Sequence, residues 1–365
     1  MFNCIIRVDA SFTMGSGHVM RCLTLADSLR IKNVTIDFVS RQLPGNMNDY
    51  IESKGYKVHK LPYDPKMLEN RIDKKTIWSG ECWQNDMQQT LAILKNISKQ
   101  KEIEWLIIDH YGLDVQWEQA MRIYVRNIMV IDDLADRKHD CNLLLDQNLY
   151  LDMKMRYKDL IPEYCKTLLG PQYVLLRPEF YVAKQKAQVR DKQIKRILIF
   201  FGGSDPTNET NKALRAITLL NRTDITIDVI VGKINPHRDE IKQYCDQFLY
   251  INFYCQVENM ADLMVRADLA IGAGGSATWE RCYLGLPTLV VITADNQQEV
   301  SEATEINKAI INLGKFDQVT KEKIYEALIS TIEDSLLRRN ISENAFTLMG
   351  ISTRGVDLII EYMFG

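Results

Sequence analysis

The sequence predicts an α/β protein made of two halves, each of which alternates strands with helices. Apolar runs alternate with segments of helical period both before and after a less apolar stretch at residues 150–195. Many of the runs are short and apolar on both faces, as buried parallel strands are. The chain has 365 residues, 46% of them hydrophobic, a length that suits two domains of ~100 to 200 residues each.

The first half opens as a βαβ unit. Residues 4–8 are an apolar strand, residues 19–29 carry their apolar side chains on one helical face, and residues 34–39 form the next strand. Three later runs have the pattern of buried parallel strands and end in polar residues: 105–108, 128–131 and 143–145.

The stretch at residues 150–195 is predicted to be a linker, because it contains Gly170-Pro171 and Arg177-Pro178 and ends in a charged run. A second series of strands follows it, with a helix from about Asn208: 196–201, 226–231, 250–253, 269–271 and 288–292. Residues 320–363 have a helical pattern and are expected to pack on one or both domains.

These elements predict three parts: a first domain at residues 1–170, a second at 190–330, and C-terminal helices at 331–365. Loops that follow parallel strands gather at the carboxyl edge of a sheet. We therefore expect the site in a cleft between the two halves, with the carboxyl ends of both sets of strands facing it.

Composition excludes several classes of partner. The formal net charge is −3 and the lysines and arginines are scattered, so neither nucleic acid nor a membrane surface is expected. The eight cysteines are irregularly spaced without a CxxC pair, which predicts buried thiols in a reducing compartment. With no signal-like N-terminus and no long apolar stretch, a cytoplasmic location is expected.

The first glycine loop, Gly15-Ser16-Gly17-His18, follows a strand and opens a helix. The positive end of the helix dipole disfavours imidazolium, so His18 would stay neutral and ready to accept a proton. A structural histidine is the competing interpretation. The loop also matches half of the nicotinamide-dinucleotide fingerprint, but Met20 replaces the third glycine and Asp37 lies inside the second strand pattern.

The second glycine loop, at residues 272–276, is the stronger phosphate signal. Gly274 and Gly275 let the backbone approach a ligand, and the amides of Ser276, Ala277 and Thr278 are expected to point out of a helix start. A diphosphate fits there without a metal. Glu280 follows at a position where a carboxylate can accept hydrogen bonds from a ribose. A tight turn that needs glycine for packing is an equally weighted alternative.

Two polar groups follow buried strands of the first half. Asp109, His110 and Tyr111 come after one strand; Tyr111 could contact a substrate and Asp109 could orient a neighbour, but a helix cap by Asp109 with a half-buried Tyr111 is the favoured interpretation. The pair Asp132-Asp133 follows the next strand and is expected to be a solvated loop rather than a metal site.

Taken together, the motifs resemble the PseG family, the hydrolases of pseudaminic acid biosynthesis. The resemblance covers roughly residues 1–300 in order, and it is carried by these segments: 7–26, 106–112, 131–148, 170–181, 200–208, 272–287 and 294–297. Residues 62–90 look like an insertion relative to shorter members, and the tail after about residue 310 is longer.

The resemblance implies a GT-B fold, with two Rossmann-like domains and UDP held mainly by the second. It implies that His18 is the general base, that Tyr111 lies near the sugar, and that Asn296 binds substrate. Residues 276–278 and Glu280 fall where UDP is held, while Gly15 and Gly17 would let sugar and water approach. No metal or cofactor is implied.

The implied reaction is hydrolysis of UDP-2,4-diacetamido-2,4,6-trideoxy-β-L-altropyranose, with C–O cleavage and inversion at the anomeric carbon. Two alternatives stay open. A glycosyltransferase of the same fold would use His18 to deprotonate an acceptor hydroxyl, and a UDP-sugar-binding protein would show no turnover and leave His18 without a role.

Overall fold

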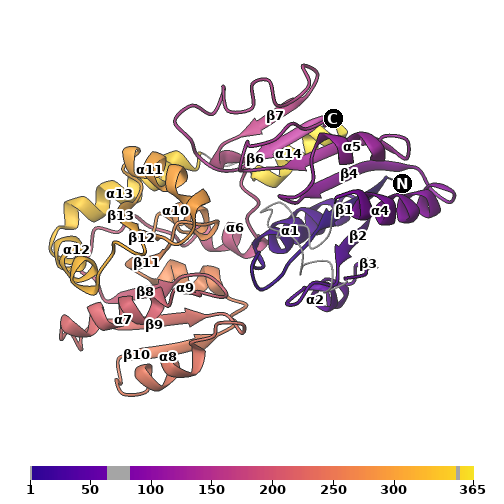
Figure 1. Ribbon diagram of the computed structural model, residues 1–365. Coiled ribbons are helices and arrows are strands. Elements are labelled where there is room, and N and C mark those ends of the chain that lie inside the picture. The colour runs from indigo at the N-terminus through magenta and orange to yellow at the C-terminus, as the bar shows by residue number, and fades with distance from the viewer. Residues whose placement is uncertain (1, 64–82, 351–353) are drawn as a thin grey trace. The chain divides into compact units, whose positions relative to one another are not determined.

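The computed structural model describes residues 2–63, 83–350 and 354–365, which fall into two compact units (Figure 1). Unit 1 comprises Met1–Asn148, Asp152–Leu175 and Arg354–Gly365, and unit 2 comprises Leu149–Leu151 and Leu176–Thr353. The chain thus leaves unit 1, builds unit 2 and returns to unit 1 for its last helix. The proposed insertion at residues 62–90 lies mostly outside the described residues.

Unit 1 contains a parallel sheet of seven strands in the order β3-β2-β1-β4-β5-β6-β7. Its strands are β1 (Asn3–Val8), β2 (Thr35–Arg41), β3 (Lys57–Leu61), β4 (Ile103–Asp109), β5 (Val125–Ile131), β6 (Leu143–Asp146) and β7 (Lys166–Leu169). Its helices are α1 (Gly17–Ile31), α2 (Asn48–Ser53), α4 (Trp83–Ser98), α5 (Val115–Met121), the 3-10 turn η2 (Pro171–Tyr173) and α14 (Gly355–Phe364).

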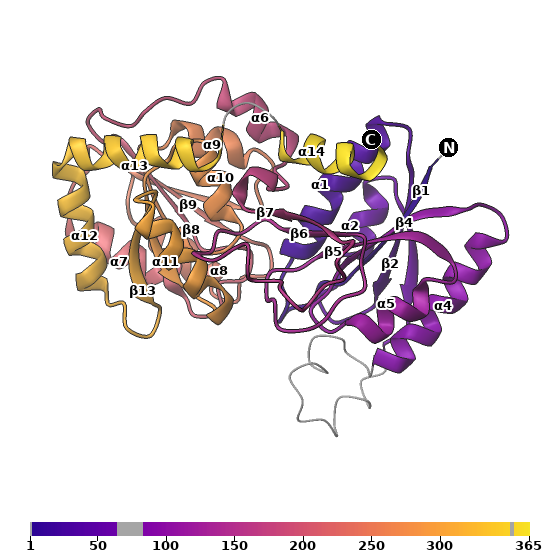
Figure 2. The same cartoon turned by 90° about the horizontal axis from the view of Figure 1, so that it is seen from above.

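Helices cover both faces of this sheet. Along β1 the side chains alternate, so that Ile6 packs in a core with α1, α2 and α14, while Ile5 packs in the opposite core with α4 and α5. Helix α14 lies beside α1, as Figure 2 shows. Such double burial explains why the strands are apolar on both faces, which is the pattern that made them predictable.

Unit 2 contains a parallel sheet of six strands in the order β10-β9-β8-β11-β12-β13. Its strands are β8 (Arg196–Phe200), β9 (Thr226–Val231), β10 (Ile251–Cys255), β11 (Leu269–Ala273), β12 (Thr288–Ile292) and β13 (Ile311–Lys315). Its helices are α6 (Pro178–Lys184), α7 (Glu209–Leu219), α8 (Arg238–Cys245), α9 (Met260–Arg266), α10 (Ala277–Tyr283), the 3-10 turn η3 (Asp295–Gln297), α11 (Gln298–Ile306), α12 (Lys321–Glu333) and α13 (Ser335–Leu348).

The strand order reverses direction at one point in each sheet. In unit 1 this point lies between β1 and β4, and in unit 2 it lies between β8 and β11. Ligands of open α/β sheets bind outside the carboxyl ends of the strands at such points. The loop that carries His18 follows β1, and the second glycine loop follows β11, so the fold places both glycine loops at these points.

Two expectations about local structure need correction, and two strands were missed. The chain does pass from unit 1 to unit 2 within residues 150–195, between Leu175 and Leu176, but the stretch is not a plain linker, because β7 pairs in register with β6 and both η2 and α6 follow it. Strands β3 and β13 were not predicted, since their exposed or half-buried residues blur the apolar pattern. Among the seven described cysteines, all unpaired, Cys255 is exposed rather than buried, and Cys82 lies outside the described residues.

The C-terminal helices divide between the units. Residues of α12 pack in the core of unit 2, whereas Val356, Ile359 and Ile360 of α14 pack in a core of unit 1. None of the helices in the described ranges has the length and apolar character needed to span a membrane.

Candidate functional site

The loop between β1 and α1 is tightly turned. The amide of Gly15 donates to the Ser11 carbonyl at 2.8 Å, and the Ser11 hydroxyl accepts from the Met14 amide at 3.0 Å. Gly15 has a φ of +75°, so its conformation itself favours glycine. Gly17 differs: its φ is not positive, and an added Cβ would meet no atom within 4 Å. The described structure therefore gives no steric reason for glycine at position 17.

His18 lies in the first turn of α1, buried to 6% exposure. Its Nδ1 is 2.6 Å from Oδ1 of Asp109, the last residue of β4. Asp109 is fully buried. It is not a helix cap as expected; Asp114 caps α5 by accepting from the Gln116 amide. Of the two roles considered for Asp109, orienting a neighbour is the one that the structure shows.

Arg21 completes this arrangement and was not identified from the sequence. Its Nε and Nη2 each lie 2.6 Å from one oxygen of Asp109, and its Nη1 lies 3.2 Å from Asp133. Burial alone would raise the pKa of Asp109, but Arg21 and His18 outweigh it and hold that pKa well below its usual range. Arg21 follows His18 by three residues on one helix, a spacing that brings side chains to the same face.

Tyr111 packs its ring edge to face against His18, with ring centroids 4.6 Å apart. It is buried to 8% exposure rather than half-buried. Burial raises the pKa of its hydroxyl above the ordinary value, and the nearby carboxylate of Asp133 adds to this effect. The structure thus brings together His18, Asp109, Tyr111, Arg21 and Asp133 at the carboxyl edge of the sheet.

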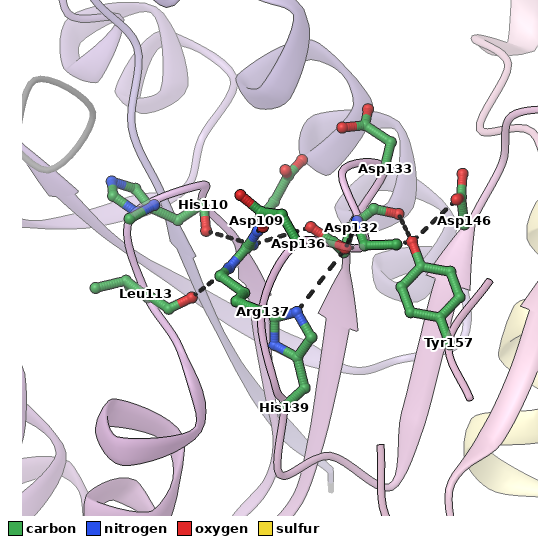
Figure 3. Close-up of polar contacts among 12 residues, drawn as sticks. Asp109, His110, Leu113, Asp132, Asp133, Asp136, Arg137, His139, Asp146 and Tyr157 are labelled. Carbon is green, nitrogen blue, oxygen red and sulfur yellow. Dashed lines mark hydrogen bonds and ion pairs between the residues drawn. The ribbon is translucent and has the colours of Figure 1, made fainter. Parts of the chain in front are cut away.

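The segment after β5 is a second buried polar cluster, and the expectation of a solvated loop is wrong. Figure 3 shows Asp132 among Arg137, His139 and Tyr157. Asp132 is fully buried, with Arg137 Nη2 at 2.9 Å from its Oδ1. Burial would raise its pKa, but His139 and Arg137 lower it below the usual range. These contacts fold the loop inward.

The pKa of Asp146, at the end of β6, is shifted in the opposite direction from that of Asp132. It accepts from the Tyr157 hydroxyl at 2.9 Å, as Figure 3 shows. Burial, followed by the charge of Asp133, raises the pKa of Asp146 to about 7. In the described parts of the chain, no group of three His, Cys, Asp or Glu residues could hold a metal ion.

In unit 2, the second glycine loop connects β11 to α10. A Cβ at Gly274 would lie 2.5 Å from Ser301 Oγ, so packing requires glycine there, whereas at Gly275 it would make only an ordinary contact with Gln297 at 3.5 Å. Ser276 is exposed and Ala277 half-buried. The expectation that the Thr278 amide points outward is wrong, because it donates to the Gly275 carbonyl at 2.8 Å.

Two further predicted residues lie on neighbouring segments. Glu280, on α10, forms an ion pair with Arg177 at 3.2 Å. Asn296 is exposed in η3. The next residue, Gln297, accepts from the Thr293 amide at 2.9 Å, and its side chain also lies next to Gly274 and Gly275. The loop after β12 is therefore held beside the glycine loop.

Solved structures of known proteins share this architecture. The chain resembles Acinetobacter baumannii MurG with a TM-score of 0.65 and 12% identity, over 100% of this chain and 99% of that chain. It also resembles Arabidopsis thaliana UGT89C1 complexed with UDP, with a TM-score of 0.67 and 11% identity over 100% of both chains. The chain has the GT-B fold. Residues 197–349 of this GT-B protein match the glycosyltransferase family 28 C-terminal domain.

Curated relatives confirm the resemblance found in the sequence. The UDP-2,4-diacetamido-2,4,6-trideoxy-β-L-altropyranose hydrolase of Campylobacter jejuni is 25% identical over 81% of this chain and 94% of its own length. The spore coat polysaccharide biosynthesis protein SpsG of Bacillus subtilis is 23% identical over 94% of this chain and 93% of its own length. An uncharacterized protein of Methanocaldococcus jannaschii is 30% identical over 80% of this chain, which spans 56% of that protein's length.

Proposed function

We propose that this GT-B protein hydrolyses UDP-2,4-diacetamido-2,4,6-trideoxy-β-L-altropyranose to UDP and the free sugar, a step of pseudaminic acid biosynthesis. The family 28 domain and the relatives indicate an enzyme that acts on nucleotide sugars. The observation that carries the proposal is the contact of His18 Nδ1 with Asp109. The name of the Campylobacter jejuni relative supports water, rather than another hydroxyl compound, as the acceptor.

The contact with Asp109 supports Nε2 of His18 as the proposed base. An ionised carboxylate can only accept hydrogen bonds, so at 2.6 Å Nδ1 must carry the proton that it donates to Oδ1. Arg21 Nη2 lies 3.2 Å from Nδ1 but 2.6 Å from Oδ1, and it donates to the carboxylate. In the neutral ring that the proposal requires, Nε2 then carries the lone pair and is the atom that takes a proton.

In the proposed reaction, a water oxygen forms a bond to the anomeric carbon from the side opposite UDP. The bond between that carbon and the phosphate oxygen breaks, and UDP leaves with the electron pair, which inverts the anomeric configuration. His18 Nε2 takes the proton of the water, and the imidazolium that forms is stabilised by Asp109. Such general-base assistance typically contributes ~10² to 10⁴ in rate.

Two glycines, Gly17 in unit 1 and Gly275 in unit 2, support a ligand position beside each of them. Neither backbone conformation nor packing explains Gly17 or Gly275 in the described structure. Close approach of a ligand does explain them, since a side chain would occupy that space. We place sugar and water at Gly15–His18 and the diphosphate at Gly275–Ala277, where the amides of Ser276 and Ala277 are expected to face it. Tyr111 then lies near the sugar, Glu280 toward the ribose and Asn296 as a further contact.

The test combines His18→Asn with a time course followed by NMR in water enriched in ¹⁸O. We expect the wild-type protein to release UDP without an added acceptor, with the label in the sugar and the inverted anomer formed first. His18→Asn should lower kcat at least ~10²-fold and leave UDP affinity nearly unchanged.

His59→Asn is the matched control. His59 also contacts an aspartate, Asp37 at 3.1 Å, but it lies on β3 away from the glycine loop, so activity should persist. Full activity of His18→Asn would refute the base assignment. UDP release only with an added acceptor would identify a glycosyltransferase, and UDP binding without turnover would identify a binding protein.

A further inference from the structure

Arg281 is a fully buried arginine without a carboxylate partner among the described residues. The largest fully buried side chains include three arginines, Arg7, Arg41 and Arg281. Arg7 and Arg41 both lie within ion-pair distance of Asp86, at 2.6 and 2.8 Å. The neighbouring acid of Arg281, Glu280, instead pairs with Arg177. Arg281 is therefore a different kind of buried cation from the other two.

The guanidinium of Arg281 lies at the base of the second glycine loop. Its Nη2 donates to the Ala273 carbonyl at 2.7 Å and to the Thr278 hydroxyl at 3.0 Å, which joins the end of β11 to the first turn of α10. Gly272 makes room for it, because a Cβ there would lie 2.8 Å from Nη1. The charge thus sits directly beneath the loop between these two elements.

Two of its nitrogen atoms, Nε and Nη1, are buried without a hydrogen-bond partner in the described structure. Burial lowers the pKa of Arg281 to about 10, so the group still carries its charge at neutral pH. A buried cation without a counter-ion destabilises the protein that holds it. Such a group is compensated when an anion binds nearby.

We infer that Arg281 stabilises the diphosphate of a bound nucleoside diphosphate through its charge, from beneath the loop at Gly274–Ala277. The inference rests on the proposed function, which places the UDP diphosphate on that loop. The ligand supplies a negative charge to a guanidinium that has no ion-pair partner among the described residues, and the low-polarity surroundings strengthen the attraction.

This role has a signature that a structural role does not share. Replacing a buried, unpaired charge by an apolar side chain of similar size is commonly neutral or stabilising. Arg281→Met should therefore leave the unfolding midpoint of the ligand-free protein unchanged or raise it, while UDP binding weakens. A guanidinium needed only for packing would show the reverse: a lower midpoint and unchanged affinity.

The experiment measures binding of UDP, UMP and uridine to the full-length chain by calorimetry, with NMR for uridine. For Arg281→Met we expect the Kd of UDP to rise at least tenfold, the Kd of UMP to rise less, and uridine binding to stay unchanged. Arg281→Lys keeps the charge and should stay within about threefold of wild type for UDP. Arg281→Gln keeps a donor for the Ala273 carbonyl without the charge, and it should repeat the loss.

Arg190→Met is the matched control, because Arg190 is also buried but donates to the main-chain carbonyls of Gln188, Val265 and Leu284. It should lower stability without changing UDP affinity. Unchanged UDP affinity in both Arg281→Met and Arg281→Gln would overturn the inference, as would parallel losses of UDP and uridine. Failure of the wild-type protein to bind UDP would instead overturn the proposed function together with this inference.

Discussion

The two units neutralise their buried arginines in different ways. In unit 1, the guanidinium groups contact carboxylates: Arg7 with Asp9 and Asp86, and Arg21 with Asp109 and Asp133. In unit 2, Arg190, Arg281 and Arg338 donate to main-chain carbonyls instead. Arg281 retains two buried nitrogen atoms without a hydrogen-bond partner in the described structure, and Arg338 retains one.

This difference matches the two tasks that we propose for the units. Around His18, charges that are balanced within the protein hold the imidazole in one orientation and one tautomer before any ligand arrives. Beneath the second glycine loop, the protein supplies the positive charge of Arg281, and we propose that the diphosphate of a bound ligand neutralises it. A site that moves a proton needs the first arrangement, and a site that binds a diphosphate benefits from the second.

The largest effect is expected from Asp109→Asn, which breaks the balanced arrangement at its centre. An amide can turn its NH₂ group toward Nδ1 and so favour the wrong tautomer of His18. We expect kcat to fall ~10² to 10⁴-fold, measured by the NMR time course, with UDP affinity unchanged in calorimetry. A kcat within threefold of wild type would contradict the tautomer assignment.

Asp86→Leu tests the pairing of buried arginines with a carboxylate at a place in unit 1 that has no proposed catalytic role. It removes the partner shared by Arg7 and Arg41 and also the acceptor of the Trp117 indole at 3.0 Å. Breaking a buried ion pair typically costs ~3 to 5 kcal/mol. That loss should appear in the free energy of unfolding of unit 1, measured by urea-dependent hydrogen exchange of β1 and β4. If Asp86→Leu lowered the free energy of unfolding as little as Arg281→Met does, the two units would not differ in how they neutralise buried arginines.

Asp146 gives a pH test within unit 1. Because its pKa rises from 3.8 in the reference state to about 7 in the folded protein, its stabilising contribution is complete below about pH 4 and is lost as the pH rises through about 7. Asp146→Asn should match wild type at pH 4 and exceed it at pH 8 by at most ~4 kcal/mol. Hydrogen exchange at both pH values measures this, and parallel pH profiles would refute it.

A smaller effect than that of Asp86→Leu is expected from Arg338→Met in unit 2. Arg338 donates to the carbonyls of Thr331, Ile332 and Lys192. Losing hydrogen bonds of this kind costs ~1 to 3 kcal/mol, which hydrogen exchange of α12 and α13 should detect. The same measurement on Arg281→Met should give a change near zero, because removing the buried charge with its two unpaired nitrogen atoms offsets the hydrogen bonds that are lost. If Arg281→Met cost more than Arg338→Met, Arg281 would be a structural arginine.

The sequence predicted most strands and both glycine loops, because strands buried on two faces leave continuous apolar runs and the loops follow them directly. It did not predict β3, β7 or β13, whose residues are largely exposed or half-buried. Side-chain contacts were harder to predict than strands, because Asp109, which contacts His18, lies 91 residues away in the sequence. No local pattern distinguishes a carboxylate that caps a helix from one that binds an imidazole.

Helix α14 has a consequence for how the protein is made. Its residues Val356, Ile359 and Ile360 fill a core of unit 1, and the Trp105 indole donates to the Met363 carbonyl at 3.2 Å. These residues leave the ribosome only after all of unit 2 has been synthesised. All of unit 2 is therefore synthesised before α14 can cover the apolar core of the unit that carries His18.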